Sequence, residues 1–83
     1  MEPPEEHEPE YPTDRVTRLL RARLAAGEWE PGQRMPSVAV LARELDVGHG
    51  TVRRALQRLA DEGLVVTLPR YGTFRRRGTP PKD

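Results

Sequence analysis

Apolar residues recur at helical spacing in three segments of the chain, and a short apolar run follows them. The first segment predicts a helix from about Asp14 to Ala26. Its apolar face consists of Val16, Leu19, Leu20 and Leu24. Thr13 is the expected N-cap, and Gly27 suits the left-handed residue that commonly follows a helix.

The second and third segments lie close together and are separated by a sharp turn. Pro36 ends the preceding segment and Ser37 is a good N-cap, which predicts a helix over Val38–Leu45. The turn at 46–48 should bring Val47 into the core. A third helix is expected over His49–Glu62. The predicted buried faces are Val38, Leu41, Ala42 and Leu45 in the second helix and Val52, Ala55, Leu56 and Leu59 in the third.

After Gly63 the pattern changes to that of a β-hairpin. We expect strands at about 64–68 and 73–76, with a tip at 69–72. The loop at 28–32 contains Trp29, which should pack against the edge of the core. Helix, tight turn, helix and hairpin in this order predict a mainly α fold with a small β-hairpin wing, a three-helix winged helix-turn-helix.

The length and the two ends of the chain limit its organisation. With 83 residues, of which 35% are hydrophobic, one small domain is expected over 13–77. An acidic tail at 1–12 and the end at 78–83 should be disordered. The absence of cysteine excludes disulfides and thiolate chemistry. No apolar run reaches the roughly 20 residues of a membrane span, and the acidic N-terminus is unlike a secretory signal, so we expect a cytoplasmic protein.

The net charge of +1 hides an uneven distribution. Residues 1–10 contain five glutamates and no Lys or Arg. Removing those five from the 13 acids leaves eight against 14 bases, so residues 11–83 have a formal charge of +6. A basic folded part suggests a polyanionic partner. The alternative is a bias toward arginine with a solvated surface, and composition does not separate the two.

The outward face of the third helix is the sharpest candidate site. Arg53 lies one turn from the helix start, where its side chain can reach a guanine edge or a phosphate. Thr51 and the free N–H groups of the first turn suit a phosphate oxygen, and Gly50 permits close backbone approach. His49 could donate to a base or phosphate, more strongly as the pH falls.

Arg54 also lies on this face. There is an alternative to DNA contact for the arginines of the third helix. In that alternative, Arg53, Arg54 and Arg58 form a solvated cationic face. These arginines would then be paired with Asp61 or Glu62.

Two further places are candidates for DNA contact. The hairpin tip is basic and aromatic, which suits phosphate or minor-groove contact; its candidate residues are Arg70, Tyr71, Gly72 and Thr73. The alternative there is an ordinary polar turn. Ser37 caps the second helix, and the N-terminus of that helix usually abuts the DNA backbone in this motif.

The chain offers no constellation for catalysis. His7 lies in the predicted tail and His49 is isolated, so neither a metal cluster nor a catalytic dyad is expected. Glycine-rich phosphate loops are missing as well. We therefore expect no enzyme activity, no cofactor and no metal.

Over about residues 11–76 the chain resembles the DNA-binding domain of the GntR family of bacterial transcription regulators. The matching pieces are Gly27, Pro31-Gly32, Met35-Pro36-Ser37, Leu41-Ala42, Val47, Thr51-Val52-Arg53-Arg54-Ala55-Leu56, Leu59, Glu62-Gly63-Leu64 and Gly72-Thr73-Phe74. The resemblance implies a repressor that binds a palindromic operator in double-stranded DNA as a homodimer. It also implies DNA-contact positions at Ser37, Thr51, Arg53 and Gly72.

Three departures from the family pattern change the expected details. Val38-Ala39 stands where the family commonly has Glu-Arg, and Gly48-His49 where it commonly has Ser-Arg. Arg70 of the wing is the candidate to compensate for the lost arginines. The third departure is that the family usually adds a C-terminal effector-binding domain, which these 83 residues do not include. We therefore expect no small-molecule effector site in this chain.

The leading prediction is thus a sequence-specific DNA-binding transcriptional regulator, a repressor or autoregulator. Its recognition helix at 49–62 would enter the major groove, and its wing at 64–76 would touch the backbone or minor groove. The alternatives are a winged-helix protein-interaction module, the N-terminal DNA-binding fragment of a longer effector-responsive regulator, or a module fused to an enzyme.

Overall fold

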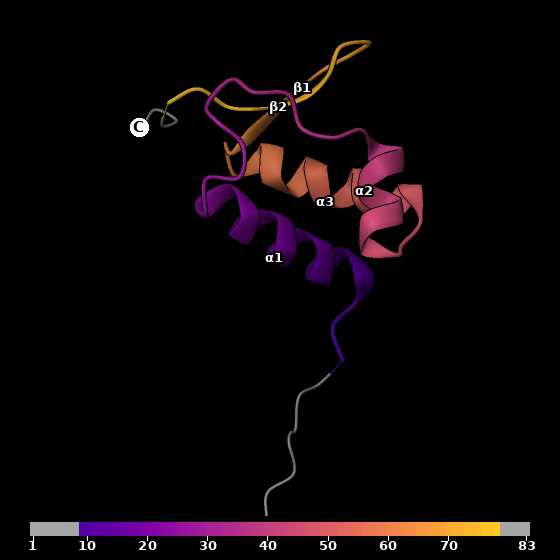
Figure 1. The fold of residues 1–83 in the computed structure, drawn as a ribbon. Helices are drawn as coiled ribbons and strands as arrows, with labels where there is room; N and C mark the ends of the chain where they lie inside the picture. The colour runs from indigo at the N-terminus through magenta and orange to yellow at the C-terminus, as the bar shows by residue number, and fades with distance from the viewer. Residues whose placement is uncertain (1–8, 79–83) are drawn as a thin grey trace, which may run out of the picture.

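The computed structural model describes residues 9–78 and has three helices followed by one antiparallel hairpin (Figure 1). The helices are α1 (Pro12–Ala25), α2 (Val38–Leu45) and α3 (His49–Asp61), and the strands are β1 (Val65–Leu68) and β2 (Gly72–Arg75). In Figure 1, α3 lies between α1 and the hairpin, and α2 packs at one end. The predicted fold class is confirmed. Disorder was expected over 1–12 and 78–83, and residues 1–8 and 79–83 of these lie outside the described range. The bound at residue 12 is wrong, because Pro12 begins α1 and Glu10 pairs with Arg18 of that helix.

Helix α1 begins two residues before the predicted start, and the predicted N-cap is wrong. Tyr11 is the N-cap and makes no side-chain capping bond, while Pro12 occupies the first helical turn. Proline suits that position because its fixed φ is already helical and its missing N–H has no intrahelical partner there. Thr13 therefore lies inside the helix, where its carbonyl accepts a hydrogen bond from the buried Thr17 hydroxyl at 2.7 Å.

The end of α1 confirms the role expected of Gly27, which has φ +81°. The Gly27 amide donates to the carbonyl of Leu24 at 3.1 Å, and the Glu28 amide donates to that of Arg23 at 3.1 Å. These two bonds form a Schellman motif, which satisfies the last carbonyls of the helix. The chain consequently reverses direction and places Trp29 against the core.

Helices α2 and α3 are joined by the predicted sharp turn. The Ser37 hydroxyl accepts from the Val40 amide at 3.2 Å and caps α2, as expected. Asp46 ends α2 in the left-handed conformation, with φ 56°. Gly48 is the N-cap of α3, but it has no side chain that could accept a hydrogen bond from the first turn. Helix α3 ends at Asp61, one residue before the predicted end.

The core is made by the predicted faces of the three helices, except for Leu19, together with residues from the loop and the wing. Leu19 is only partly buried and lies outside the core, whereas Thr17 of the same helix is buried. Val38, Leu45 and Val47 pack against it while remaining partly exposed. Trp29 is only 4% exposed, so it belongs to the core itself rather than to its edge, and the Arg23 guanidinium stacks on it at 4.9 Å from the ring centroid. The buried core residues are Val16, Leu20, Leu24, Trp29, Met35, Leu41, Ala42, Val52, Ala55, Leu56, Leu59 and Val65.

The wing is more extensive than a two-stranded hairpin. Its strands pair in the register Val66 with Phe74 and Thr67 with Thr73. The segment Gln33–Met35 before α2, for which the sequence predicted no strand, pairs with the outer side of β2. The Met35 amide donates to the Thr73 carbonyl at 2.8 Å, and the Arg75 amide donates to the Gln33 carbonyl at 2.9 Å. These bonds fix the wing to the start of α2.

A tight turn closes the hairpin. The Tyr71 amide donates to the Leu68 carbonyl at 2.9 Å, which spans Pro69 and Arg70. Arg70 has φ +76°, a conformation that a type II turn requires at its third residue and that glycine adopts most easily. The tip therefore holds an arginine in a strained conformation.

Candidate nucleic-acid interface

The outward face of α3 lies as predicted. Val52, Ala55, Leu56 and Leu59 are buried, so Arg53, Arg54 and Gln57 are left exposed on the opposite side. His49 is also exposed, whereas Gly50 and Thr51 are partly buried in the first turn. Within residues 9–78, Arg53 makes no ion pair. Its charge is thus available to a ligand.

A groove of about 290 Å³ separates this face from the wing. It brings together Arg53 and Gln57 of α3 with Thr67 and Thr73 of the hairpin. The hydroxyls of the two threonines lie 3.2 Å apart and share a hydrogen bond. Two predicted site residues from distant parts of the sequence, Arg53 and Thr73, therefore line one concave surface. Gln57 and Thr67 belong to it as well, although the sequence did not single them out as site residues.

The other predicted site residues lie around this groove rather than in it. Arg54 turns toward α1, where its Nε donates to the Thr13 hydroxyl at 3.4 Å. Arg70 and Tyr71 stand at the exposed tip of the wing, and Gly72 begins β2 behind them. None of these four residues lines the groove.

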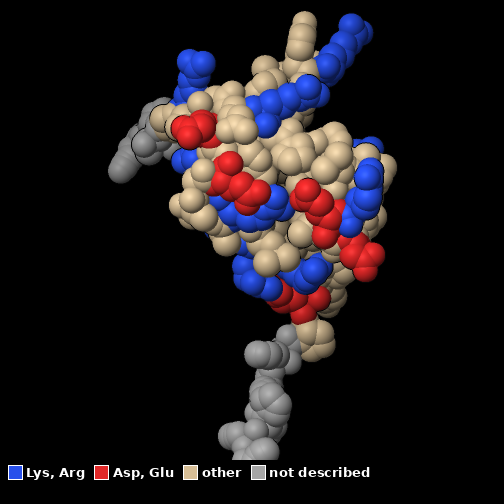
Figure 2. Space-filling model, in the orientation of Figure 1, with Lys and Arg blue, Asp and Glu red and all other residues tan. Residues whose placement is uncertain are grey.

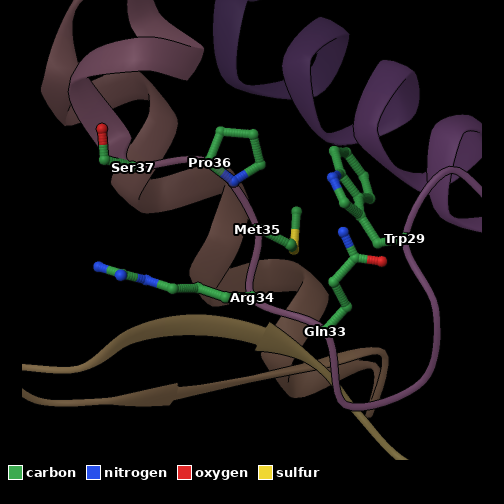
Figure 3. Close-up of a pocket in the computed structure, with 6 residues that line it drawn as sticks. All are labelled: Trp29, Gln33, Arg34, Met35, Pro36 and Ser37. Carbon is green, nitrogen blue, oxygen red and sulfur yellow. The ribbon is translucent and has the colours of Figure 1, made fainter.

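Ser37 lies in a separate shallow hollow of about 450 Å³ on the other side of the wing root (Figure 3). Trp29, Gln33, Arg34, Met35 and Pro36 complete that hollow. Because the Ser37 hydroxyl already accepts the capping bond from Val40, its second lone pair and its proton remain for a ligand.

Every ion pair within residues 9–78 involves a residue of α1. Arg18 binds Glu10, Arg21 binds Glu62, and Arg23 binds Glu28 and Glu44. Hydrogen bonding to the arginines holds the pKa of both Glu28 and Glu62 below the ordinary carboxyl value. These pairs neutralise Arg18, Arg21 and Arg23 of α1.

The proposed pairing of the α3 arginines with the acids at the end of their own helix is wrong. Arg58 instead donates to Asp14 of α1. Glu62 is paired with Arg21, and Asp61 accepts from Gln57 at 3.1 Å. The carboxylates that the sequence assigned to Arg53 and Arg54 are therefore engaged elsewhere, because α1 packs beside α3.

Arginine and carboxylate charges are consequently separated in space. Residues 47–60 and 63–78 contain no Asp or Glu, and both stretches hold arginines. Figure 2 shows basic side chains, which the sequence identifies as arginines, on the projecting hairpin without acidic side chains beside them, whereas acidic and basic groups are mixed over the body below. Residues 47–60 and the wing thus contribute positive and no negative side chains to the surface.

Metal and membrane binding receive no support from the described residues. Within residues 9–78, no three His, Asp or Glu side chains come together where they could hold a metal ion. None of the helices there is both long enough and apolar enough to cross a membrane.

A helix-turn-helix with a β-hairpin wing and an exposed cationic second helix defines a winged helix-turn-helix DNA-binding domain. The family model described as "Bacterial regulatory proteins, gntR family" matches residues 12–74. The chain therefore belongs to the gntR family of bacterial regulatory proteins.

Individual relatives agree with this assignment. The histidine utilization repressor of Klebsiella aerogenes is 38% identical over 61 residues, which cover 74% of this chain and 25% of the relative. The HTH-type transcriptional regulator Rv1152 of Mycobacterium tuberculosis is 44% identical over 57 residues, covering 69% of this chain and 47% of the relative. The chain spans about a quarter of the length of the histidine utilization repressors that it matches.

Solved structures share the fold. A putative transcriptional regulator GntR from Rhodococcus sp. RHA1 superposes with a TM-score of 0.72 at 36% identity, over 81% of this chain and 32% of that chain. The DNA-binding domain of AraR in complex with operator ORR3 superposes with a TM-score of 0.80 over 90% of both chains. At 23% identity the AraR domain is similar to this chain in fold.

Proposed function

We propose that this chain is the operator-reading module of a bacterial transcriptional repressor. The observation that most favours this function is the charge separation: ion pairs neutralise Arg18, Arg21 and Arg23 of α1, while residues 47–60 and 63–78 hold arginines and no carboxylate. Such a surface attracts the DNA backbone and is not screened by the protein's own acids. Relatives named as repressors and a related fold crystallised on an operator support the proposal.

In the proposed complex, α3 enters the major groove and the wing contacts the backbone or minor groove. Arg53 reads a guanine edge or a phosphate, and Thr51 with the first-turn amides binds phosphate. The remaining contacts are proposed for Ser37, His49, Gly50, Arg54, Arg70, Tyr71, Gly72 and Thr73. The groove between Arg53 and Thr73 would receive the edge of the DNA that passes between helix and wing.

The proposal extends to the assembly. Two copies would bind the half-sites of a palindromic operator, because two-fold symmetric DNA sites match two-fold symmetric protein pairs. We propose that small-molecule effectors act outside residues 13–77, and that the protein works where bacterial DNA lies, in the cytoplasm. The hollows at Ser37 and Arg53 suit DNA better than a buried metabolite, since both open to solvent.

A DNA titration tests the proposal. Binding of the chain to duplex DNA flanking its own gene should weaken steeply between about 50 and 200 mM salt, as expected for several phosphate contacts. Arg53→Ala should lose most of the binding. Arg21→Ala is the matched control, because it removes the same charge from an ion pair on α1. If the folded protein binds no duplex at low salt, the function as a protein-interaction module becomes the better explanation.

A further inference from the structure

Arg34 occupies a defined place on the outer side of the wing. It forms an antiparallel bridge with Phe74 of β2. The hydrogen bonds on either side of this bridge are those between Met35 and Thr73 and between Gln33 and Arg75. Arg34 and Phe74 are thus a non-hydrogen-bonded pair, in which the two side chains stand close together on one face of the sheet.

Gly72 provides the space through which the Arg34 side chain continues. It is the diagonal neighbour of Arg34 across the strands, at the distance that long side chains reach. A Cβ built on Gly72 would lie 2.8 Å from the Arg34 Nε and 3.4 Å from its Nη2. Because Gly72 has no side chain, the guanidinium lies directly over its backbone. Figure 3 shows Arg34 projecting away from Trp29, alongside the hairpin.

The charge of Arg34 is not neutralised by any side chain within residues 9–78. Within residues 9–78 it makes no ion pair, and residues 63–78, which form the wing, contain no acid. The first turn of α2, Val38-Ala39-Val40, offers no cation of its own. Arg34 is therefore the charged group of the hollow that it shares with Ser37.

We propose that Arg34 is a further DNA-contact residue, whose guanidinium binds a backbone phosphate beside the wing. A planar guanidinium can hold two phosphate oxygens at once, and the Ser37 hydroxyl in the same hollow can donate to the same strand. Such a contact raises affinity without reading the base sequence. This inference rests on the proposed operator binding and adds a contact on the far side of the wing from Arg53.

The test is the salt dependence of binding by Arg34→Gln in the full chain. Affinity is measured by fluorescence anisotropy for the duplex flanking its own gene and for a shuffled duplex of the same length. Losing one phosphate contact should reduce the slope of log affinity against log salt by about 0.9. Both duplexes should be affected by a similar factor. Arg34→Lys should restore the slope, since a cation remains, and Arg18→Gln, which removes a charge paired with Glu10, should leave it unchanged.

The outcomes separate this inference from the proposed function. A wild-type slope in Arg34→Gln would overturn the phosphate contact while leaving operator binding intact. A loss confined to the specific duplex would overturn it too, because Arg34 would then be reading bases. If the wild-type chain binds neither duplex, the proposed function fails and the inference fails with it. Arg34 is exposed, so the variants should fold; thermal unfolding checks this.

Discussion

Arg21 of α1 donates from Nε and Nη2 to both carboxylate oxygens of Glu62, at 2.9 and 2.6 Å. The two residues are 41 positions apart in the sequence, and Glu62 is the C-cap of α3. This two-pronged contact therefore ties the end of the recognition helix to α1. The hydrogen bonds from Arg21 also hold the pKa of Glu62 below its ordinary value.

The first prediction is that this pair makes stability dependent on acid pH. Because the folded-state pKa of Glu62 is lowered, its stabilising effect is present above the ordinary value of 4.5 and is lost as the pH falls through the lowered pKa. Arg21→Ala should lower the melting temperature at neutral pH, and the difference from wild type should vanish in strong acid. Arg43→Ala, exposed on α2 and outside the ion pairs found within residues 9–78, is the control. A difference that persists unchanged in acid would contradict the prediction.

The second prediction concerns the left-handed Arg70 at the wing tip. A non-glycine residue in this region costs about 1 kcal/mol or more, so Arg70→Gly should stabilise the domain by about that amount. Arg70→Ala keeps the Cβ and should show no such gain. Both variants lose the same charge and should weaken DNA binding equally. Chemical unfolding and anisotropy measure the two effects; equal stability of the variants would show that the turn is unstrained.

The third prediction is that Gly48→Ser stabilises α3. Gly48 has the extended conformation of an N-cap, with φ −76° and ψ 161°, and a Cβ there would meet nothing within 4 Å. A serine hydroxyl can accept from an amide of the first turn, which improves on glycine by a few tenths of a kcal/mol. Gly48→Ala fits the same space but cannot cap, so it should be about 1 kcal/mol less stable than Gly48→Ser. Equal unfolding free energies for serine and alanine would refute the capping argument.

The fourth prediction tests whether the acidic N-terminus competes with DNA. Replacing Glu2, Glu5, Glu6 and Glu8 with glutamine keeps the chain length and leaves the Glu10–Arg18 pair intact. If the tail competes, the variant should bind DNA modestly more tightly at low salt, and the gain should shrink as salt screens the charges. An affinity equal to that of wild type at every salt concentration would show that the tail does not compete with DNA.

The helical part of the fold was predictable because its signals are local. The apolar spacing around Leu41 and Leu56 identifies the buried faces, and Ser37 marks a helix start through its own hydroxyl. The start of α1 was misplaced because two good signals, Pro12 and Thr13, are adjacent, and proline at the first helical position prevailed. The family pattern also depends on residues in fixed register, so it could be read from sequence.

Strand pairings and ion pairs between residues far apart in the sequence could not be predicted. The segment Gln33–Met35 alternates for too few residues to indicate a strand, and its pairing with β2 appears only when the wing is in place. The partners of Arg58 and Glu62 were misassigned because the sequence does not say which side of α3 faces α1. The proximity of Arg34 to Gly72 likewise arises from strand register. The proposed DNA contacts themselves remain predictions.

The pairing of Gln33–Met35 with β2 has a mechanical consequence. Between the Met35–Thr73 hydrogen bond and the Ser37 cap there is one intervening residue, Pro36, whose φ is fixed by its ring. The hairpin and the start of α2 are therefore joined by a short and rigid connection. A force that displaces the wing tip reaches the first turn of α2 through this short stiff connection, so the wing and the helix-turn-helix should tilt together as one body.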